Sequence, residues 1–401
     1  MGSVSGRPAG RLPWAFASLL IARAIYAYNW YDVGPIQTGL ARTFASPPGD
    51  LSFALWAFLF AVGAFQIPAG ILSLRTSPRT VSLIGVLVLG AGATGSALVT
   101  NLWAFVALRF VVGIGAALFF SPAMALLTEY YEGERRGLAF GVFNGAFSLG
   151  AALAVFLTPV LANQSGDSVA LLVGGIAMLA IALENLWVLP PTVKSSEVSP
   201  GAEAVSRTLR SPLLWILALS LLGFWAANFA VPQYIVSFAR EVRGFTVAQS
   251  GGLDAIFVMT ALLGSPLGGY LASRTHRARV LLAIGVVLVM LSILALPYLP
   301  DILLWGDALL FGITSGYLFG VLYLIPTRYR EFDRKTAALS IGLINGIQVI
   351  GGSFLVLSGG YFFFGSGNYA GLWWFFGLVC IAPLVLLLWV RRTEPGDQRF
   401  L

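Results

Sequence analysis

Long apolar runs separated by short polar breaks extend through the whole chain. In the first half they cover residues 14–38, 51–73, 80–99, 102–128, 137–162 and 168–189. In the second half they cover residues 212–238, 247–272, 280–299, 302–326, 336–363 and 369–390. Runs of about 20 apolar residues are long enough to cross a hydrocarbon core of about 30 Å as helices. The pattern predicts an all-α polytopic membrane protein with 12 transmembrane helices in two sets of six.

The polar segments between these runs predict the domain organisation and the orientation. Residues 191–211 are polar and charged, so residues 1–190 and 212–401 are expected to form two six-helix bundles joined by a linker. Of the 24 Lys and Arg residues, 19 lie in segments on one side of the membrane, whereas the opposite loops hold Arg42, Arg240 and Arg243. The positive-inside rule therefore predicts a protein of the cell (plasma) membrane with both termini cytoplasmic. No cleaved signal peptide is expected, because a full-length apolar run follows the first basic residues.

Composition agrees with this pattern and excludes several classes of protein. Hydrophobic residues make up 58% of the chain, charged residues make up 10%, and the mean hydropathy is +0.86. Basic loops that face anionic lipid account for the net charge of +7, so no nucleic-acid partner is expected. A single cysteine, Cys380, and a single histidine, His276, argue against a disulfide framework and against a metal centre. The chain shows no catalytic triad, P-loop or nucleotide-binding fingerprint, so neither an enzyme nor a cofactor is expected.

One pattern, G-x-x-N-G-x4-G, occurs once in each half, at residues 141–150 and 342–351. Each copy follows a basic pair, which places Asn144 about 12 Å and Asn345 about 15 Å into the membrane from the same side. Helical spacing puts Ser148 and Gln348 on the faces of these asparagines. Two interpretations remain open. The amides bind a polar substrate from both bundles, or the glycines allow close packing and the asparagines bond between helices.

A second repeat lies in the short basic loops, where residues 70–76 match residues 269–275. With the arginine motif at 108–117 and the basic entry at 135–141, these loops resemble the major facilitator superfamily. The resemblance implies two bundles related by a pseudo-two-fold axis, a substrate site near the midplane, and transport by rocking of the bundles. Leu74 and Ser273 stand where the family's loop motif carries an acid. The resemblance also implies gating roles at the basic helix ends for Arg75, Arg79, Glu129, Arg136 and Arg274.

Four ionisable residues stand out inside the predicted spans, where each costs about 2.5–3.5 kcal/mol on insertion scales. The depths of Asp32 and Arg109 differ by about 6–7 Å, so we expect the side chains to meet. Their pair either carries coupling protons, as in the proton-coupled transporters that the chain resembles, or is a static salt bridge. Arg23 lies near the midplane and either binds an anionic substrate or extends to cytoplasmic water. Asp254 is either a proton carrier of the second bundle or a partner of Arg23.

Together these residues predict a secondary active transporter for a small organic solute, coupled to protons and working by alternating access. Arg23 and Arg109 beside paired amides favour a small organic anion such as a carboxylate. The alternative is a drug/proton antiporter for lipophilic or cationic compounds. Nitrate is disfavoured, because the arginines that nitrate porters carry in helices 2 and 8 are missing. The residues expected to contact substrate are Arg23, Asn29, Trp30, Asn144, Ser148, Trp225, Asn228, Tyr317, Asn345 and Gln348.

Two alternatives come from another class, a transporter-like receptor and a membrane enzyme, and the missing enzyme motifs argue against the second. Loops shorter than about 25 residues leave no room for a soluble catalytic or ATP-binding domain. The expected partners are therefore a small-molecule substrate, protons and the lipid bilayer, and the chain is expected to be a monomer.

Overall fold

The computed structural model describes residues 12–131, 133–191, 210–275, 277–328 and 334–381, together with Ser206 and residues 385–386. Every regular element in these ranges is a helix. The first half contains α1 (Leu12–Tyr31), η1 (Gly34–Ile36), α2 (Gln37–Thr43), η2 (Pro48–Leu51), α3 (Ser52–Arg75), α4 (Pro78–Leu98), α5 (Leu102–Tyr130), α6 (Gly133–Ser165) and α7 (Asp167–Val188). The second half contains α9 (Pro212–Ser220), α10 (Leu222–Glu241), α11 (Val247–Met259), α12 (Ala261–Thr275), α13 (Ala278–Ala295), α14 (Asp301–Arg328), α15 (Arg334–Gly359), η3 (Gly360–Phe364) and α16 (Tyr369–Leu378). The expected linker, residues 191–211, lies almost wholly outside the described residues.

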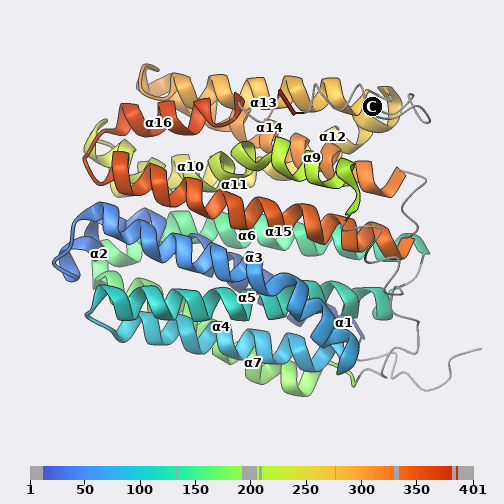
Figure 1. Ribbon diagram of the computed structural model, residues 1–401. Coiled ribbons are helices and arrows are strands. Elements are labelled where there is room, and N and C mark those ends of the chain that lie inside the picture. The colour runs from blue at the N-terminus through green and yellow to red at the C-terminus, as the bar shows by residue number, and fades with distance from the viewer. Residues whose placement is uncertain are drawn as a thin grey trace, which may run out of the picture.

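The helices of each half pack mainly on one another, and the two halves lie side by side with their helices roughly parallel (Figure 1). In the first half α1 packs on α6 and α7, and α5 packs on α3 and α4. In the second half α14 packs on α12 and α13. Within the described chain, 10 segments are long and apolar enough to cross a membrane. The first and last expected spans correspond to α1 and to the described part of α16.

Large apolar side chains cover the outside of the helices. Leu263 is 66% exposed, Ile302 is 78% exposed and Trp187 is 83% exposed. A surface of this kind is unfavourable in water and favourable in lipid. The exposed apolar side chains therefore support the prediction of an integral membrane protein.

Helix 1 is interrupted, so the expectation of one continuous helix over residues 14–38 is wrong at its end. α1 stops at Tyr31, and the chain continues as η1 and α2. Pro35 gives a physical reason, because it has no backbone N–H to donate to the carbonyl of Tyr31. The carbonyls in the last turn of α1 are left free to accept hydrogen bonds from side chains.

Two interfaces hold the halves together, one between α3 and α15 and the other between α6 and α11. A Cβ atom added at Gly63 of α3 would lie 2.5 Å from Ile350 Cγ1 and 3.2 Å from the carbonyl oxygen of Gly346. One added at Gly251 of α11 would lie 3.2 Å from the Cα atom of Phe156. Glycines at these positions let the backbones of the two halves approach closely.

Both interfaces widen toward the end that carries the basic loops. Beyond Gly63 and Gly346, a Cβ added at Gly70 or Gly342 would meet no heavy atom within 4 Å in the described part of the chain. Along α6, a Cβ at Gly145 would lie 3.5 Å from Leu262 Cδ2, and one at Gly141 would meet no described atom within 4 Å. Among the described residues, the halves are therefore tightly packed at one end and farther apart at these glycines near the basic end.

Candidate substrate and proton-coupling site

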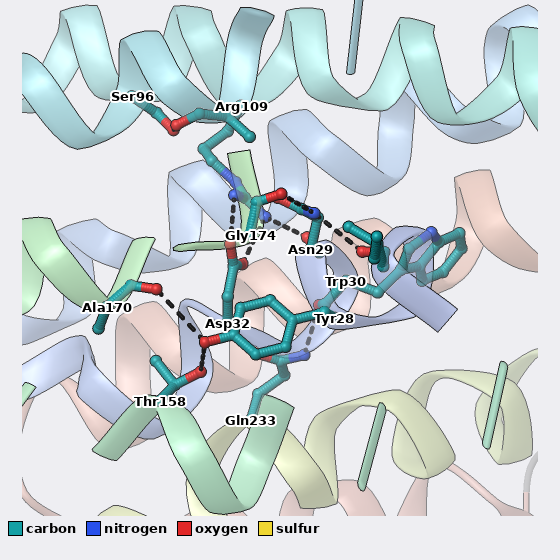
Figure 2. Close-up of polar contacts among 12 residues, drawn as sticks. Tyr28, Asn29, Trp30, Asp32, Ser96, Arg109, Thr158, Ala170, Gly174 and Gln233 are labelled. Atoms are coloured by element: carbon teal, nitrogen blue, oxygen red, sulfur yellow. Dashed lines mark hydrogen bonds and ion pairs between the residues drawn. The ribbon is translucent and has the colours of Figure 1, made fainter. Parts of the chain in front are cut away.

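A buried ion pair joins α5 to the C-terminal end of α1 (Figure 2). Arg109 Nη2 lies 3.0 Å from Asp32 Oδ1, Nη1 lies 3.3 Å from Oδ2, and both side chains are 1% exposed. Nη2 also donates to the carbonyl of Asn29 at 2.6 Å. The predicted contact between Asp32 and Arg109 is confirmed. The arginine also satisfies a free carbonyl at the negative end of the α1 dipole.

Two neighbouring side chains of α1 face α6 and α7 of the same half. The Tyr28 hydroxyl accepts a hydrogen bond from Thr158 at 3.1 Å and donates to the carbonyl of Ala170 at 3.3 Å. Asn29 Nδ2 donates to the carbonyl of Gly174 at 3.3 Å. Figure 2 shows these bonds beside the ion pair. Asn29 was expected to contact substrate, but here its side chain fixes α1 to α7.

Arg23 lies inside a cage of four aromatic rings. Its Cζ atom is 4.4 Å from the ring centroid of Phe120, 4.6 Å from those of Tyr26 and Phe147, and 5.2 Å from that of Phe143. The side chain is 6% exposed, and Nε and Nη1 have no hydrogen-bond partner in the described chain. This burial does not match the interpretation in which Arg23 extends to water. It places an enclosed positive charge within the first half.

Aromatic side chains continue from this cage to the second half. The ring of Trp30 lies 5.9 Å from Phe147 and 6.1 Å from Phe229 of α10, centroid to centroid. Phe229 in turn stacks on Trp225 at 5.9 Å. Among the described residues, no group accepts a hydrogen bond from Trp30 Nε1, which is buried. Trp30 and Trp225 therefore lie where the two halves meet, and their contact with substrate stays a prediction.

Asp254 of α11 is buried without a partner. It is 0% exposed, and neither carboxyl oxygen has a hydrogen-bond partner among the described residues. Tyr31 of α1 lies close enough to interact electrostatically with this carboxyl. Arg23 forms no ion pair with it, because its guanidinium is enclosed by the aromatic cage. The interpretation of Asp254 as a partner of Arg23 is therefore not met in this conformation.

The two copies of the duplicated pattern have different surroundings. Asn144 of α6 is exposed, whereas Asn345 of α15 donates to Gln66 Oε1 of α3 at 3.1 Å, across the interface between the halves. Gln348 is 0% exposed, and neither atom of its amide group has a partner in the described part of the chain. The asparagines therefore do not form a symmetric pair. Gln348 is the buried amide with unused hydrogen-bonding capacity.

The other expected contact residues differ in their placement. Ser148 of α6 and Asn228 of α10 are half-buried. Tyr317 of α14 donates to the carbonyl of Leu281 of α13 at 3.0 Å, so its hydroxyl faces a helix of its own half. Tyr317 is therefore occupied in packing the second half.

Comparison with known proteins identifies the family. The model of the Major Facilitator Superfamily matches residues 19–338, which is most of the chain. The chain belongs to the major facilitator superfamily. Members of this superfamily are membrane transporters and not enzymes, and the all-helical fold described above agrees with membership.

The chain is similar in sequence to two transport proteins and in fold to one solved structure. It is 26% identical over 366 residues to the nitrite extrusion protein of Bacillus subtilis (strain 168), with 91% of each chain covered. It is 26% identical to the probable nitrate/nitrite transporter NarK2 of Mycobacterium tuberculosis (strain ATCC 25618 / H37Rv), with 86% of this chain and 87% of that protein covered. The crystal structure of a bacterial homologue of the human lysosomal transporter Spinster, inward-facing and unoccupied, has a TM-score of 0.75 at 16% identity, with 96% of each chain covered.

The residues expected to act as a gate in this facilitator lie at the basic helix ends. Arg79 donates to the carbonyls of Leu189 and Leu186 at 2.9 and 2.7 Å, so it completes the C-terminus of α7 within one half. Arg274 is exposed and lies 5.1 Å from the ring centroid of Tyr270 on its own helix. Glu129 is half-buried. The side chains of Arg75 and Arg136 lie outside the described residues, so their predicted roles stay predictions.

The sequence analysis missed a pair of glutamines that joins the halves at the end opposite the basic loops. Gln37 Nε2 donates to the carbonyl of Gln233 at 2.8 Å, and Gln233 Nε2 donates to the carbonyl of Trp30 at 3.2 Å. Both side chains are 0% exposed. We refer to Gln37 and Gln233 as the glutamine pair. Each glutamine is a polar side chain inside an apolar span. That contrast was the signal that could have identified the pair.

Asp307 was also missed. It lies in α14, inside the expected span 302–326, and is 8% exposed. Its Oδ2 atom has no hydrogen-bond partner within the described ranges. A carboxyl within an apolar span was by itself a sufficient signal.

Proposed function

We propose that this chain is a secondary active transporter of a small anion, with an organic carboxylate as the favoured class, and that transport is coupled to protons. The observation that carries the proposal is the buried guanidinium of Arg23, which has no carboxylate in contact and whose Nε and Nη1 atoms have no hydrogen-bond partner in the described chain. A guanidinium is always charged, and burying it without an anion is costly. An anionic substrate would supply the missing acceptor.

The distribution of charge in the described helices supports an anion. The charge of Arg109 is balanced by Asp32. Arg23 has no carboxylate in ion-pair contact within the described chain and is surrounded by rings instead. The buried Gln348 and the indole of Trp30 offer further free hydrogen-bonding atoms. A carboxylate with an apolar part matches this combination of one cation, polar atoms and aromatic surface.

The names of the relatives point to anions as well. Both curated relatives described above are named for nitrite or for nitrate and nitrite. Among the described residues, the buried positive charge that no carboxylate balances is that of Arg23 in helix 1, and it does not come from helices 2 and 8. We therefore keep carboxylate as the favoured class and make nitrate a direct competitor in the test.

Two carboxyl groups support proton coupling. Asp254 is buried without a partner, and Asp32 is paired with an arginine that also holds the end of α1. Protonation of Asp32 would release Arg109 from its ion pair and change the stability of the broken helix 1. With the positive-inside rule, the end at which the halves separate would face the cytoplasm.

Liposomes that contain the purified protein test this function. We expect radiolabelled lactate to accumulate under an imposed pH gradient, and nitrate to accumulate less. Arg23→Gln should abolish accumulation, while Arg23→Lys should keep part of it because the charge is retained. Accumulation of neither anion, or uptake that Arg23→Gln leaves unchanged, would refute the proposal.

The aromatic surface and Asp254 favour the alternative, a drug/proton antiporter. A buried carboxyl among aromatic rings can bind a lipophilic cation. The same liposomes loaded with ethidium distinguish the two functions. Proton-driven export of ethidium that is lost in Asp254→Asn would establish the antiporter.

A further inference from the structure

We propose that Asp254 takes up a proton each time the two halves close at the end opposite the basic loops, so that acid favours closure of this end. The inference rests on the proposed proton coupling and assigns it to one residue and one step of the transport cycle. It starts from the position of Asp254 in α11, which packs on α6 of the other half.

Asp254 lies on the face of α11 that meets the first half. Gly251 precedes it by three residues, so both lie on one face of the helix. A Cβ atom added at Gly251 would lie 3.2 Å from the Cα atom of Phe156 and 3.2 Å from the carbonyl oxygen of Val155, both in α6. The backbones of the two halves are therefore in close contact one helical turn from Asp254. Any separation of the halves at this interface changes the surroundings of its carboxyl.

The helices around Asp254 supply no counter-charge among the described residues. Tyr31 of α1 is close enough to interact with the carboxyl electrostatically, but a neutral hydroxyl does not balance a charge. The sequence of α6 has no charged residue from 138 to 165, and α11 has no other charged residue. The titratable residues of α10, α12 and α14 with described side chains are Tyr234, Arg240, Glu241, Tyr270, Arg274, Asp301, Asp307 and Tyr317. None of them forms a hydrogen bond or an ion pair with Asp254.

A negative charge on Asp254 is unfavourable while the interface is closed. The residue is 0% exposed. A carboxylate that is buried without a hydrogen bond or a counter-ion is unstable relative to its neutral form. The carboxyl is therefore neutral while α6 and α11 are in contact. When the halves separate here, water reaches the group and the proton leaves to that water, so closure binds one proton and opening returns it.

Two other buried carboxyls of the described chain lie within one half, so this step does not change their neighbours. Asp32 of α1 and Arg109 of α5 both belong to the first half, and their ion pair moves as a unit. Asp307 of α14 lies near Ser292 of α13, within the second half. Among these three acids, Asp254 is the one whose burial depends on contact between the halves.

Pulsed electron paramagnetic resonance in lipid nanodiscs measures this closure without any substrate. Spin labels on Thr100→Cys, between α4 and α5, and on Ala248→Cys, at the start of α11, report the distance between the halves at the end opposite the basic loops. Both positions are exposed, whereas the native Cys380 is 1% exposed. As pH rises from about 5 to about 9, we expect the ratio of short to long distances to fall by up to about tenfold per pH unit, the limit for one linked proton.

Variants of the doubly labelled protein test whether Asp254 is the group responsible. Asp254→Asn cannot ionise, so the short distance should dominate at every pH. Asp254→Leu should behave in the same way, and it leaves no unsatisfied polar group if the asparagine variant fails to fold. Asp307→Asn is the matched control, because the same substitution at a buried acid within one half should keep the pH dependence.

The outcomes separate the inference from the proposed function. A pH dependence that survives in both Asp254 variants would overturn the inference, and so would its loss in Asp307→Asn. If the distances in the labelled protein with Asp254 intact do not change with pH but lactate still accumulates under a pH gradient, the inference is wrong and the proton-coupled transporter stands. Distances that ignore pH, together with no accumulation driven by pH, would refute both.

Discussion

The contact between Asp32 and Arg109 links two parts of the buried structure. Arg109 bonds to the carboxyl of Asp32 and to the carbonyl of Asn29, so one side chain holds both sides of the break in helix 1. Removing one partner from a buried ion pair typically costs about 3–5 kcal/mol, because the other charge is left uncompensated. An asparagine at position 32 would keep an acceptor but no charge.

We expect Asp32→Asn to lower the melting temperature and to abolish accumulation driven by a pH gradient, while exchange of substrate across the membrane continues. Melting in detergent and paired uptake and exchange assays measure these effects. The control is Asp301→Asn, the same substitution at a weak pair, because Asp301 lies 3.8 Å from Arg243 and is 56% exposed. Such a pair contributes no more than about 1 kcal/mol. Unchanged pH-driven accumulation in Asp32→Asn would identify a static salt bridge.

Asn144 and Asn345 should respond differently to truncation, although the sequence repeat makes them equivalent. Asn345→Ala leaves Gln66 Oε1 without the donor at 3.1 Å, and an unsatisfied buried group costs about 1–3 kcal/mol. Asn144 is exposed, so Asn144→Ala should change stability by less than about 0.5 kcal/mol. Thermal melting measures the stabilities, and acetate titration reports binding. A larger loss of stability in Asn144→Ala would contradict this assignment.

These residues show what the sequence could and could not predict. The helical rise of about 1.5 Å per residue was sufficient to predict that Asp32 and Arg109 lie at similar depths in the membrane, because depth depends only on position in the span. The same arithmetic placed Asn144 and Asn345 at similar depths. It could not predict that Gln66 from α3 bonds only one of them, because the contact depends on the rotation and packing of neighbouring helices. The aromatic cage of Arg23 was missed for the same reason, since three of its four rings come from other helices.

At the scale of elements, breaks occur in helices that face the other half. Helix 1 is interrupted after Tyr31, α9 and α10 are separated at Leu221, and α11 and α12 are separated at Thr260. Pro35 explains the first break. Prolines do not explain the others, and Pro68, Pro122, Pro159, Pro232 and Pro266 lie inside described helices. Proline positions alone were therefore a poor predictor of where these helices end.

The glutamine pair should keep the end opposite the basic loops closed. A Cβ atom added at Gly34 would lie 2.5 Å from the Cα atom of Gln233, so Gly34→Ala should push η1 and α10 apart. We expect this variant to increase labelling of a cysteine introduced by Thr38→Cys with a membrane-impermeant maleimide. The native Cys380 is 1% exposed and should contribute little background.

Gly306→Ala is the control for this labelling, because an added Cβ at that position meets no described atom within 4 Å. It should leave labelling of the introduced cysteine unchanged. Equal labelling in Gly34→Ala and Gly306→Ala would show that the glutamine pair does not limit access. Gln37→Ala should act in the same direction as Gly34→Ala, since it removes the donor to the carbonyl of Gln233 at 2.8 Å.

At the scale of the whole molecule, the two halves meet closely at one end and separate toward the other. The interface between α3 and α15 shows both conditions on one helix face, where Gly63 packs on Ile350 and Gly70 has no described neighbour. In alternating access the basic end has to close when the opposite end opens. A side chain at Gly70 would therefore be free in this state and would oppose closure of the basic end.

We expect Gly70→Val to leave the melting temperature close to that of the wild type and to slow transport. Gly63→Val is the matched variant, and it should lower the melting temperature because its Cβ would lie 2.5 Å from Ile350 Cγ1 and 3.1 Å from the Ile350 backbone nitrogen. Melting and the initial rate of lactate uptake, measured on both variants, separate the two effects. If Gly70→Val destabilises the protein as much as Gly63→Val, the halves are already in contact at the basic end. If it leaves the rate unchanged, closure of that end does not bring α3 and α15 together at Gly70.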